Sequence, residues 1–147
     1  MSCRGFSRAD ALVLLAMASI LAAVAVPNLL ALRMQAVRAE LPINVEAIRT
    51  AELAYRAGRD TYLRAAPHPR QVPGPEPVSW PWTNQAFEEL GFAPDGAVRG
   101  VYEVTDATSW DFMVTGTIDA DGDGEEVVCT ASRVGAAALR LGDERRY

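Results

Sequence analysis

The sequence predicts an α+β fold in which a long N-terminal helix packs through its second half on a small antiparallel sheet. Three observations predict this fold. Residues 11–32 contain no charged residue, and the stretch from Ile43 to Ala57 is amphipathic at helical spacing. The C-terminal third holds short segments in which apolar and polar residues alternate, as on a half-buried antiparallel sheet. The 147 residues suffice for one small domain and an anchor.

The uncharged block is long enough to cross a bilayer. As a helix its 22 residues extend about 33 Å, close to the thickness of the hydrocarbon core. Arg4 and Arg8 precede the block, so the positive-inside rule places the N-terminus in the cytoplasm. Pro27 lies inside the block and Pro42 follows it. Because proline removes a backbone hydrogen bond, we expect a kink at Pro27 and a break at Pro42.

A secretory signal peptide and a plain single-pass anchor both fit the block taken alone. A signal peptide would combine the basic start and the apolar core with a small-residue cleavage site at Ala23-Val24-Ala25. Two features count against it. Asp10 is an acid at the front of the apolar core, and the apolar pattern continues past the cleavage site through Leu29 and Leu30.

The residues around the block form a more specific pattern. Arg4-Gly5-Phe6 is followed by Ser7, Asp10, the apolar run and then Pro27-Asn28. Counted from Phe6, Asp10 is the fifth residue and Pro27 is the twenty-second. This arrangement resembles the N-terminal signature of type IV pilins and type II secretion pseudopilins. In that family a basic residue and Gly end a short leader, Phe begins the mature chain, and a carboxylate and a proline occupy these two positions.

The resemblance implies that prepilin peptidase cleaves between Gly5 and Phe6 and methylates the new α-amine of Phe6. It implies that Asp10 meets the amine of a neighbouring subunit and that Asp10 and Pro27 serve assembly. The family prefers Glu at Asp10 and an apolar residue at Arg8, so a minor subunit is expected as readily as a major one. Partners would be further copies, other pilins, the peptidase and the inner membrane. After assembly the chain would lie in an extracellular pilus or a periplasmic pseudopilus.

Beyond the uncharged block, the helix continues as an amphipathic segment that Gly58 ends. The stripe expected to face the sheet consists of Ile43, Ala47, Ile48, Ala51, Ala54 and Tyr55. Glu52 and Arg56 are expected to pair on the outside at i,i+4 spacing. The resulting segments are a leader (residues 1–5), a hydrophobic helix (6–32), an amphipathic half-helix (33–58), a Pro-rich loop with a short helix (59–98) and a sheet region (99–147).

Residues 59–82 contain six prolines, which argues against a helix or a central strand there. Trp80 and Trp82 either fasten this loop to the core or form a binding surface. His68 has no visible partner in the sequence. A short helix is predicted over residues 84–90, capped by Thr83, ended by Gly91 and stapled by Trp82 on Phe87.

Strands are predicted over residues 100–105, 109–119 and 126–133, with a weak last strand over residues 137–141. In the second of these the inward-facing residues are expected to be Trp110, Phe112, Val114 and Ile118. Cys129 is expected to be a small buried residue of the third strand rather than a reactive thiol.

An acidic turn joins the second and third predicted strands. Asp119, Asp121 and Asp123 alternate along it and Glu125 follows, so their oxygens can point at one hard cation such as calcium. The closing Glu of an EF-hand loop is absent, because Thr130 stands in its place. Some pilins and pseudopilins bind calcium in a C-terminal loop. A calcium site and a solvated Asp/Gly turn therefore both remain open.

The composition argues against several functions. A net charge of −5 makes the chain a poor candidate for neutralising nucleic-acid phosphates. No nucleophile with a base, His cluster or phosphate-cradling Gly loop is apparent, so we do not expect an enzyme. The expected function is that of a type IV pilus subunit. The alternatives are a pseudopilin of type II secretion, and a membrane-tethered or secreted domain that binds through Trp80, Trp82 and the acidic turn.

Overall fold

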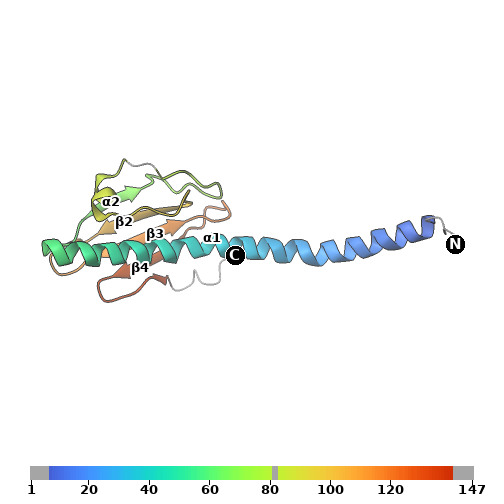
Figure 1. Cartoon of the computed structure of the whole chain (residues 1–147), viewed down its shortest axis with the longest axis horizontal. Coiled ribbons are helices and arrows are strands. Elements are labelled where there is room, and N and C mark those ends of the chain that lie inside the picture. Colours follow the sequence, from blue (N-terminus) through green and yellow to red (C-terminus); the bar gives the residue numbers. More distant parts are fainter. Residues whose placement is uncertain (1–6, 81–82, 141–147) are drawn as a thin grey trace, which may run out of the picture. The chain divides into compact units, whose positions relative to one another are not determined.

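The structure is a computed structural model, and it describes residues 7–80 and 83–140 (Figure 1). It confirms the α+β fold, with a 52-residue helix ahead of an antiparallel sheet. One compact unit ends at Gln35 and a second begins at Ala36. The elements in chain order are α1 (Arg8–Arg59), β1 (Ala65–His68), α2 (Gln85–Leu90), β2 (Gly100–Thr105), β3 (Met113–Ile118), β4 (Val127–Ser132) and β5 (Ala138–Leu139).

Helix α1 continues through both Pro27 and Pro42. The break predicted at Pro42 is therefore wrong. Proline in a helix interior removes one backbone hydrogen bond, but the residues on either side of Pro42 compensate for it. Leu41 and Val45 are fully buried in the core, and packing of an apolar face supplies most of the stability of a helix in a protein.

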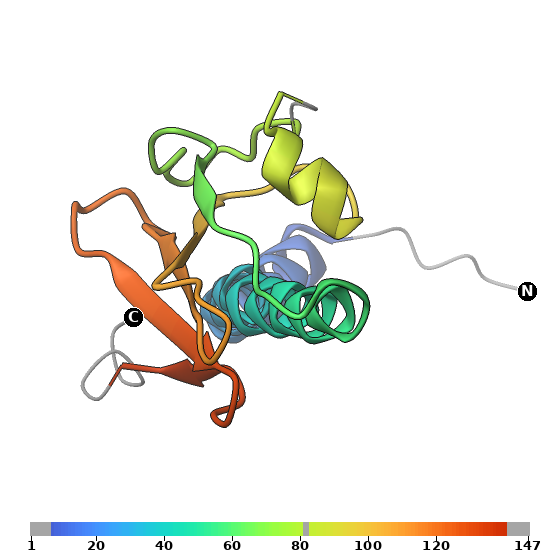
Figure 2. The same ribbon diagram turned by 90° about the vertical axis from the view of Figure 1, so that its left-hand side faces the viewer.

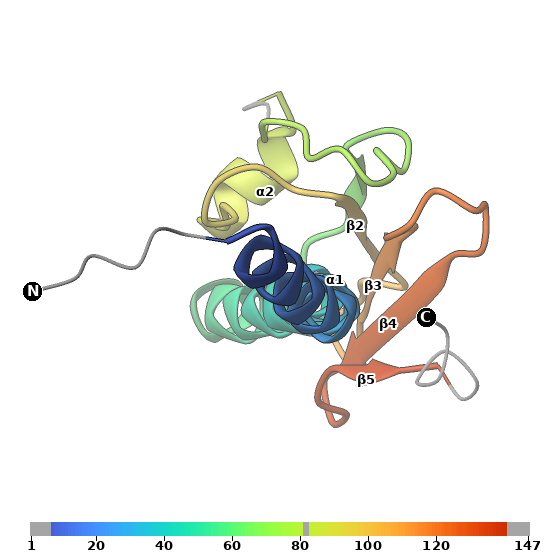
Figure 3. The ribbon, with the colours of Figure 1, turned by 90° about the vertical axis from the view of Figure 1, so that its right-hand side faces the viewer.

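The five strands form one sheet in the order β1-β2-β3-β4-β5, and each strand is antiparallel to its neighbours. Val104 of β2 lies opposite Val114 of β3, which in turn lies opposite Ala131 of β4. These three side chains are buried on the same face. Figures 2 and 3 show the second half of α1 and the short α2 on one side of this sheet. The bounds predicted for β2 are confirmed, whereas β3, β4 and β5 are shorter than predicted.

Strand β1 lies within the Pro-rich segment, where an irregular loop was predicted. The prediction was wrong for Ala65–His68 because β1 is an edge strand, which pairs with β2 alone. An edge strand tolerates a proline such as Pro67, since one side of its backbone makes no ladder hydrogen bonds. His68, to which no partner had been assigned, is buried and packs edge-on against Trp80, with ring centroids 4.5 Å apart.

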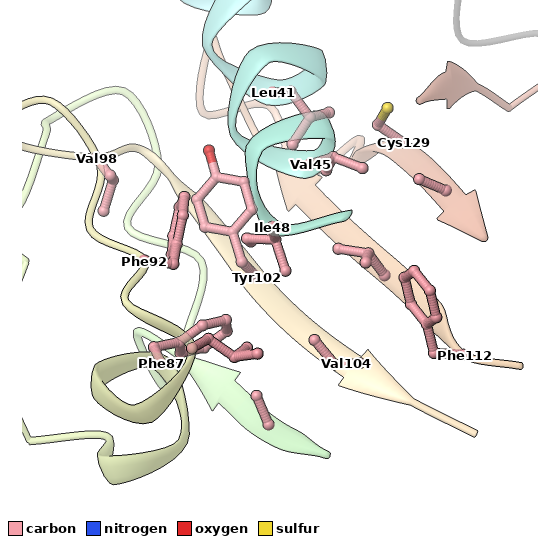
Figure 4. Packing of buried hydrophobic residues seen from close by; sticks show 14 of the residues in the cluster. Leu41, Val45, Ile48, Phe87, Phe92, Val98, Tyr102, Val104, Phe112 and Cys129 are labelled. Atoms are coloured by element: carbon pink, nitrogen blue, oxygen red, sulfur yellow. The ribbon is translucent and has the colours of Figure 1, made fainter. Parts of the chain in front are cut away.

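The face of α1 that meets the sheet differs from the predicted stripe. Leu41, Val45, Ile48 and Glu52 are fully buried, whereas Ile43 is 65% exposed. Ala47 and Ala54 of the predicted stripe are also exposed. Figure 4 shows Leu41, Val45 and Ile48 directed at the sheet. Gly116 of β3 lets α1 come this close, because a Cβ there would lie 2.6 Å from Cγ2 of Val45 and 2.8 Å from Cδ1 of Leu41.

Helix α2 is capped by Asn84 rather than by Thr83. The side chain of Asn84 accepts a hydrogen bond from the amide of Ala86, and Gly91 ends the helix with φ 69°. The expected contact of Trp82 with Phe87 lies outside the described residues. Trp80 packs on both Phe87 and Phe92, at ring-centroid distances of 5.4 and 5.7 Å. This contact supports the interpretation that Trp80 fastens the loop to the core.

Trp110 does not face the core. It lies in the turn before β3 and is 76% exposed, while Phe112 is buried two residues later. The predicted alternation is correct from Phe112 onward and wrong at Trp110, because the strand begins at Met113. Cys129 is fully buried in β4 as predicted. Burial raises the pKa of its thiol to about 11, so the thiol is unreactive near neutral pH.

Candidate functional site

The start of α1 contains the residues to which processing and assembly were assigned. Gly5 and Phe6 lie outside the described residues, so their structure does not enter the argument. Ser7 and Asp10 form a reciprocal cap. The hydroxyl of Ser7 accepts hydrogen bonds from the amides of Ala9 (3.1 Å) and Asp10 (3.3 Å), and Oδ2 of Asp10 accepts one from the amide of Ser7 (2.9 Å). This is the capping-box arrangement, which satisfies helix N–H groups that have no partner within the helix.

The cap gives Asp10 a local role that sequence reasoning missed. The signal was present as Ser7-x-x-Asp10 directly before an apolar run, which is the usual capping-box pattern. A carboxylate near the helix N-terminus also interacts favourably with the helix dipole. The predicted pairing of Asp10 with the amine of another subunit remains a prediction.

The first part of α1 is apolar and exposed over its whole length. By length and composition it is a candidate membrane span, and a signal sequence would meet the same criteria. Its large side chains point outward, for example Leu12 (67% exposed), Leu21 (71%) and Leu29 (68%). The hydroxyl of Ser19 donates to the carbonyl of Leu15 at 2.7 Å, so this polar group is satisfied within the helix. Such a segment suits an apolar environment or contact with other helices.

The acidic turn between β3 and β4 brings three carboxylates together. One oxygen each from Asp119, Asp121 and Asp123 lies within 4.8 Å of the others, an arrangement that can hold a metal ion. Glu125, the fourth predicted ligand, does not belong to this group. Asp119 is partly buried, whereas Asp121 and Asp123 are exposed.

Hydrogen bonds already shape this turn. Asp119 accepts from the amides of Gly122 (2.7 Å) and Gly124 (3.1 Å), and Asp123 accepts from the amide of Glu125 (2.7 Å). Gly122 and Gly124 have φ of 81° and 85°, which side chains larger than hydrogen disfavour. The turn is therefore held by hydrogen bonds of its own, and a metal ion would have to share oxygens that already accept backbone hydrogen bonds.

A polar network that the sequence did not predict joins α1 to β2. Oε1 of Glu40 accepts hydrogen bonds from the amide of Arg99 (2.9 Å) and the hydroxyl of Tyr102 (3.1 Å). The same hydroxyl accepts one from Nδ2 of Asn44 (2.9 Å). Burial, more than the neighbouring Glu40, raises the pKa of Tyr102, so its hydroxyl keeps its proton. This network fixes the position of α1 along the sheet.

A second polar contact joins α1 to the segment before β5. Oε2 of Glu46 accepts a hydrogen bond from the amide of Ala137 (2.9 Å), and Oε1 pairs with Arg49 (2.7 Å). The amide of Ala137 and the neighbouring Arg49 together lower the pKa of Glu46. Arg49 also donates to the carbonyls of Ser132 (2.8 Å) and Arg133 (3.2 Å). Glu46 and Arg49 thus both hold this contact through charge-assisted hydrogen bonds.

Glu52 is a fully buried carboxyl near the end of α1, not an exposed partner of Arg56 as predicted. Its Oε2 accepts a hydrogen bond from the amide of Leu63 at 2.9 Å, while Oε1 has no hydrogen-bond partner. Burial raises the pKa of Glu52 to about 7, and the Leu63 amide opposes this effect. The carboxyl therefore ties the chain after α1 back onto the helix.

Comparison with known proteins leaves the family open. No protein-family model, curated protein or solved structure matches this chain. A long N-terminal apolar helix followed by an antiparallel sheet is consistent with a pilin-like architecture.

Proposed function

We propose that this chain is a type IV pilin-like subunit, made with a short leader and assembled into a filament through its apolar helix. The role is structural rather than catalytic. Before assembly the subunit lies in the inner membrane with its N-terminus in the cytoplasm. A major and a minor pilin are both compatible with this proposal, and a pseudopilin of type II secretion is its nearest alternative.

The observation that carries the proposal is that the two parts of α1 differ in their exposure. The first part of the helix exposes a long run of apolar side chains, whereas the part from Leu41 onward buries Leu41, Val45 and Ile48 in a domain core. A helix with this construction anchors a folded domain and leaves its apolar part available for a membrane or for other helices. The Gly5-Phe6, Asp10 and Pro27 pattern supports the same function.

Intact mass of the protein from cells with and without prepilin peptidase tests the proposal. We expect the loss of residues 1–5 and the gain of one methyl group when the peptidase is present. Gly5→Leu should prevent this loss. Ala25→Leu is the matched control, because a bulky residue there would block a signal peptidase but leave the Gly5-Phe6 bond intact. Cleavage after Ala25, or no cleavage, would instead support a secreted or tethered binding domain.

Electron microscopy of the same cells then separates the two filament alternatives. Surface filaments that contain the chain support a pilus. Processed protein that stays in the periplasm and is needed for secretion supports a pseudopilin.

The acidic turn supports a second, smaller proposal, that it binds calcium weakly. Its three clustered carboxylates are the observation in favour. Calorimetry with calcium on residues 36–147 should show binding that Asp121→Ala removes, because Asp121 is exposed and its loss leaves both Asp119 hydrogen bonds in place. Glu88→Ala on α2 is the control. The absence of heat, together with an unchanged melting temperature, would leave the turn as a connection between strands.

A further inference from the structure

Trp110 is an exposed apolar side chain held by a rigid turn. It is 76% exposed, although a tryptophan favours burial by a wide margin. The hydroxyl of Thr108 accepts hydrogen bonds from the amides of Trp110 and Asp111, both at 3.1 Å. The amide of Thr108 donates to the carbonyl of Asp111 at 3.0 Å, and the next residue, Phe112, is buried. Hydrogen bonds therefore hold the backbone on both sides of Trp110, while its indole remains exposed.

A second surface of the same domain is an apolar groove. It has a volume of about 550 Å³ and lies between the outer side of α1 and the segment before β5. Its lining consists of Pro42, Ile43, Glu46, Ala47, Thr50, Ala136 and Ala137. Ile43 is 65% exposed within it. Glu46, the charged residue of the lining, already has both oxygens engaged by Arg49 and the amide of Ala137. The groove therefore offers apolar surface with no unpaired charge.

We propose that Trp110 of one copy inserts into this groove on the next copy. The inference rests on the proposed filament function and names one of its contacts. Both halves of the contact are present on this chain, and each is apolar. A buried indole N–H needs an acceptor. The hydroxyl of Thr50 can supply one, because it donates its own hydrogen to the carbonyl of Glu46 and keeps its lone pairs free.

Trp110 does not line the groove of its own copy. The turn that carries Trp110 lies at the end of α1, where the amide of Tyr62 donates to the carbonyl of Thr108 at 3.1 Å. From Ala47 in the groove to the end of α1 at Arg59 the helix advances about 18 Å. Because Trp110 and the groove lie at different places on the surface of the chain, a contact between them on two copies is heterologous. Repeated from copy to copy, such a contact gives an open array unless the rotation closes a ring.

Cysteine cross-linking on the full chain in cell membranes tests the contact while Trp110 stays in place. Ser109→Cys lies beside Trp110 in the sequence and Ala47→Cys lies on the groove; both native residues are small and exposed, and the Thr50 hydroxyl stays in place. Cys3→Ser removes the other native thiol, while Cys129 is fully buried. The matched control pairs Ser109→Cys with Ser79→Cys, an exposed residue of the Pro-rich segment that lies outside the groove.

We expect a ladder of cross-linked species from the Ser109–Ala47 pair and none above background from the control pair. Adding Trp110→Ala should reduce the ladder by roughly tenfold or more, from the apolar area that the side chain no longer buries. The same substitution should leave the melting temperature of residues 36–147 unchanged, because an exposed side chain contributes little to folding.

The different failures are distinguishable. Filaments without the Ser109–Ala47 ladder, or with a ladder that Trp110→Ala leaves unchanged, overturn the contact and leave the filament function intact. A Trp110-dependent ladder without filaments supports the contact and overturns the filament function. If neither filaments nor a ladder form, both proposals are wrong.

Discussion

Replacing Glu52 by Gln should remove most of the pH dependence that this buried carboxyl gives to folding. Its pKa rises from 4.5 to about 7 in the folded chain because it is buried. The difference corresponds to about 3 kcal/mol, from about 1.36 kcal/mol for each pKa unit. As the pH rises from 4.5 to 7, the unfolded chain releases the Glu52 proton while the folded chain retains it. The contribution of Glu52 to stability is therefore fully present below about pH 4.5 and is lost as the pH rises through about 7.

The replacement keeps the shape of the side chain and removes its charge. The amide oxygen of the new side chain can still accept the hydrogen bond from Leu63, but its amide nitrogen would stand where Oε1 of Glu52 has no partner. Leaving that donor unsatisfied costs about 1–3 kcal/mol. At pH 8 the variant should thus be equal to the native chain in stability or more stable by up to about 2 kcal/mol. Near pH 4.5 it should be less stable.

Urea unfolding of residues 36–147 between pH 4.5 and 8, followed by tryptophan fluorescence, measures this effect. The fragment retains the buried core that the structure describes. Glu88→Gln is the control, since Glu88 is exposed on α2 and its removal should leave the pH profile unchanged. The reasoning is refuted if the Glu52→Gln variant loses stability between pH 4.5 and 7 as steeply as the native fragment does.

Three further substitutions test the packing of α1 on the sheet. Tyr102→Phe should lower the free energy of unfolding by about 1–3 kcal/mol in urea titrations, because it leaves the polar network between α1 and β2 without its central hydroxyl. Gly116→Ala should cost a similar amount, about 1–3 kcal/mol, since its Cβ would collide with Val45; Gly58→Ala, which has nothing within 4 Å, should be neutral or stabilising. Pro42→Ala should raise the melting temperature by restoring a backbone donor, with a gain of at most about 3 kcal/mol. A lower melting temperature would show that the proline ring contributes more to packing than its missing hydrogen bond costs.

The sequence predicted elements that local chemistry specifies. Strand β2 has the predicted bounds, and its residues alternate between buried and half-buried along its whole length. The end of α2 was predicted from Gly91, whose positive φ is a local requirement. The acidic turn was placed between the correct strands because its Asp and Gly residues are a local turn signal. Three of its four predicted ligands do come together.

Tertiary contacts decided the features that sequence reasoning missed. Counting apolar residues placed Ile43 and Ala47 on the buried face of α1, but the core selects the face that carries Leu41, Val45 and Glu52. No rule of composition predicts that a Glu is buried and an Ile exposed. The role of Gly116 could not be predicted either. Its missing Cβ lets α1 pack closely on β3, and this need is visible only once the helix that packs there is known.

The order of the strands has a consequence for folding kinetics. Each strand pairs with the next one along the chain, and from β2 to β5 the connections are short, so these hairpins can nucleate early, whereas residues 69–99 separate β1 from β2. The contact of Leu41 and Val45 with Gly116 spans about seventy residues, so its closure costs about 2 kcal/mol more in chain entropy than closing one of these short hairpins. We expect docking of α1 on a preformed sheet to limit the folding rate. Although α1 is the first element to leave the ribosome, it would then be among the last to reach its native place.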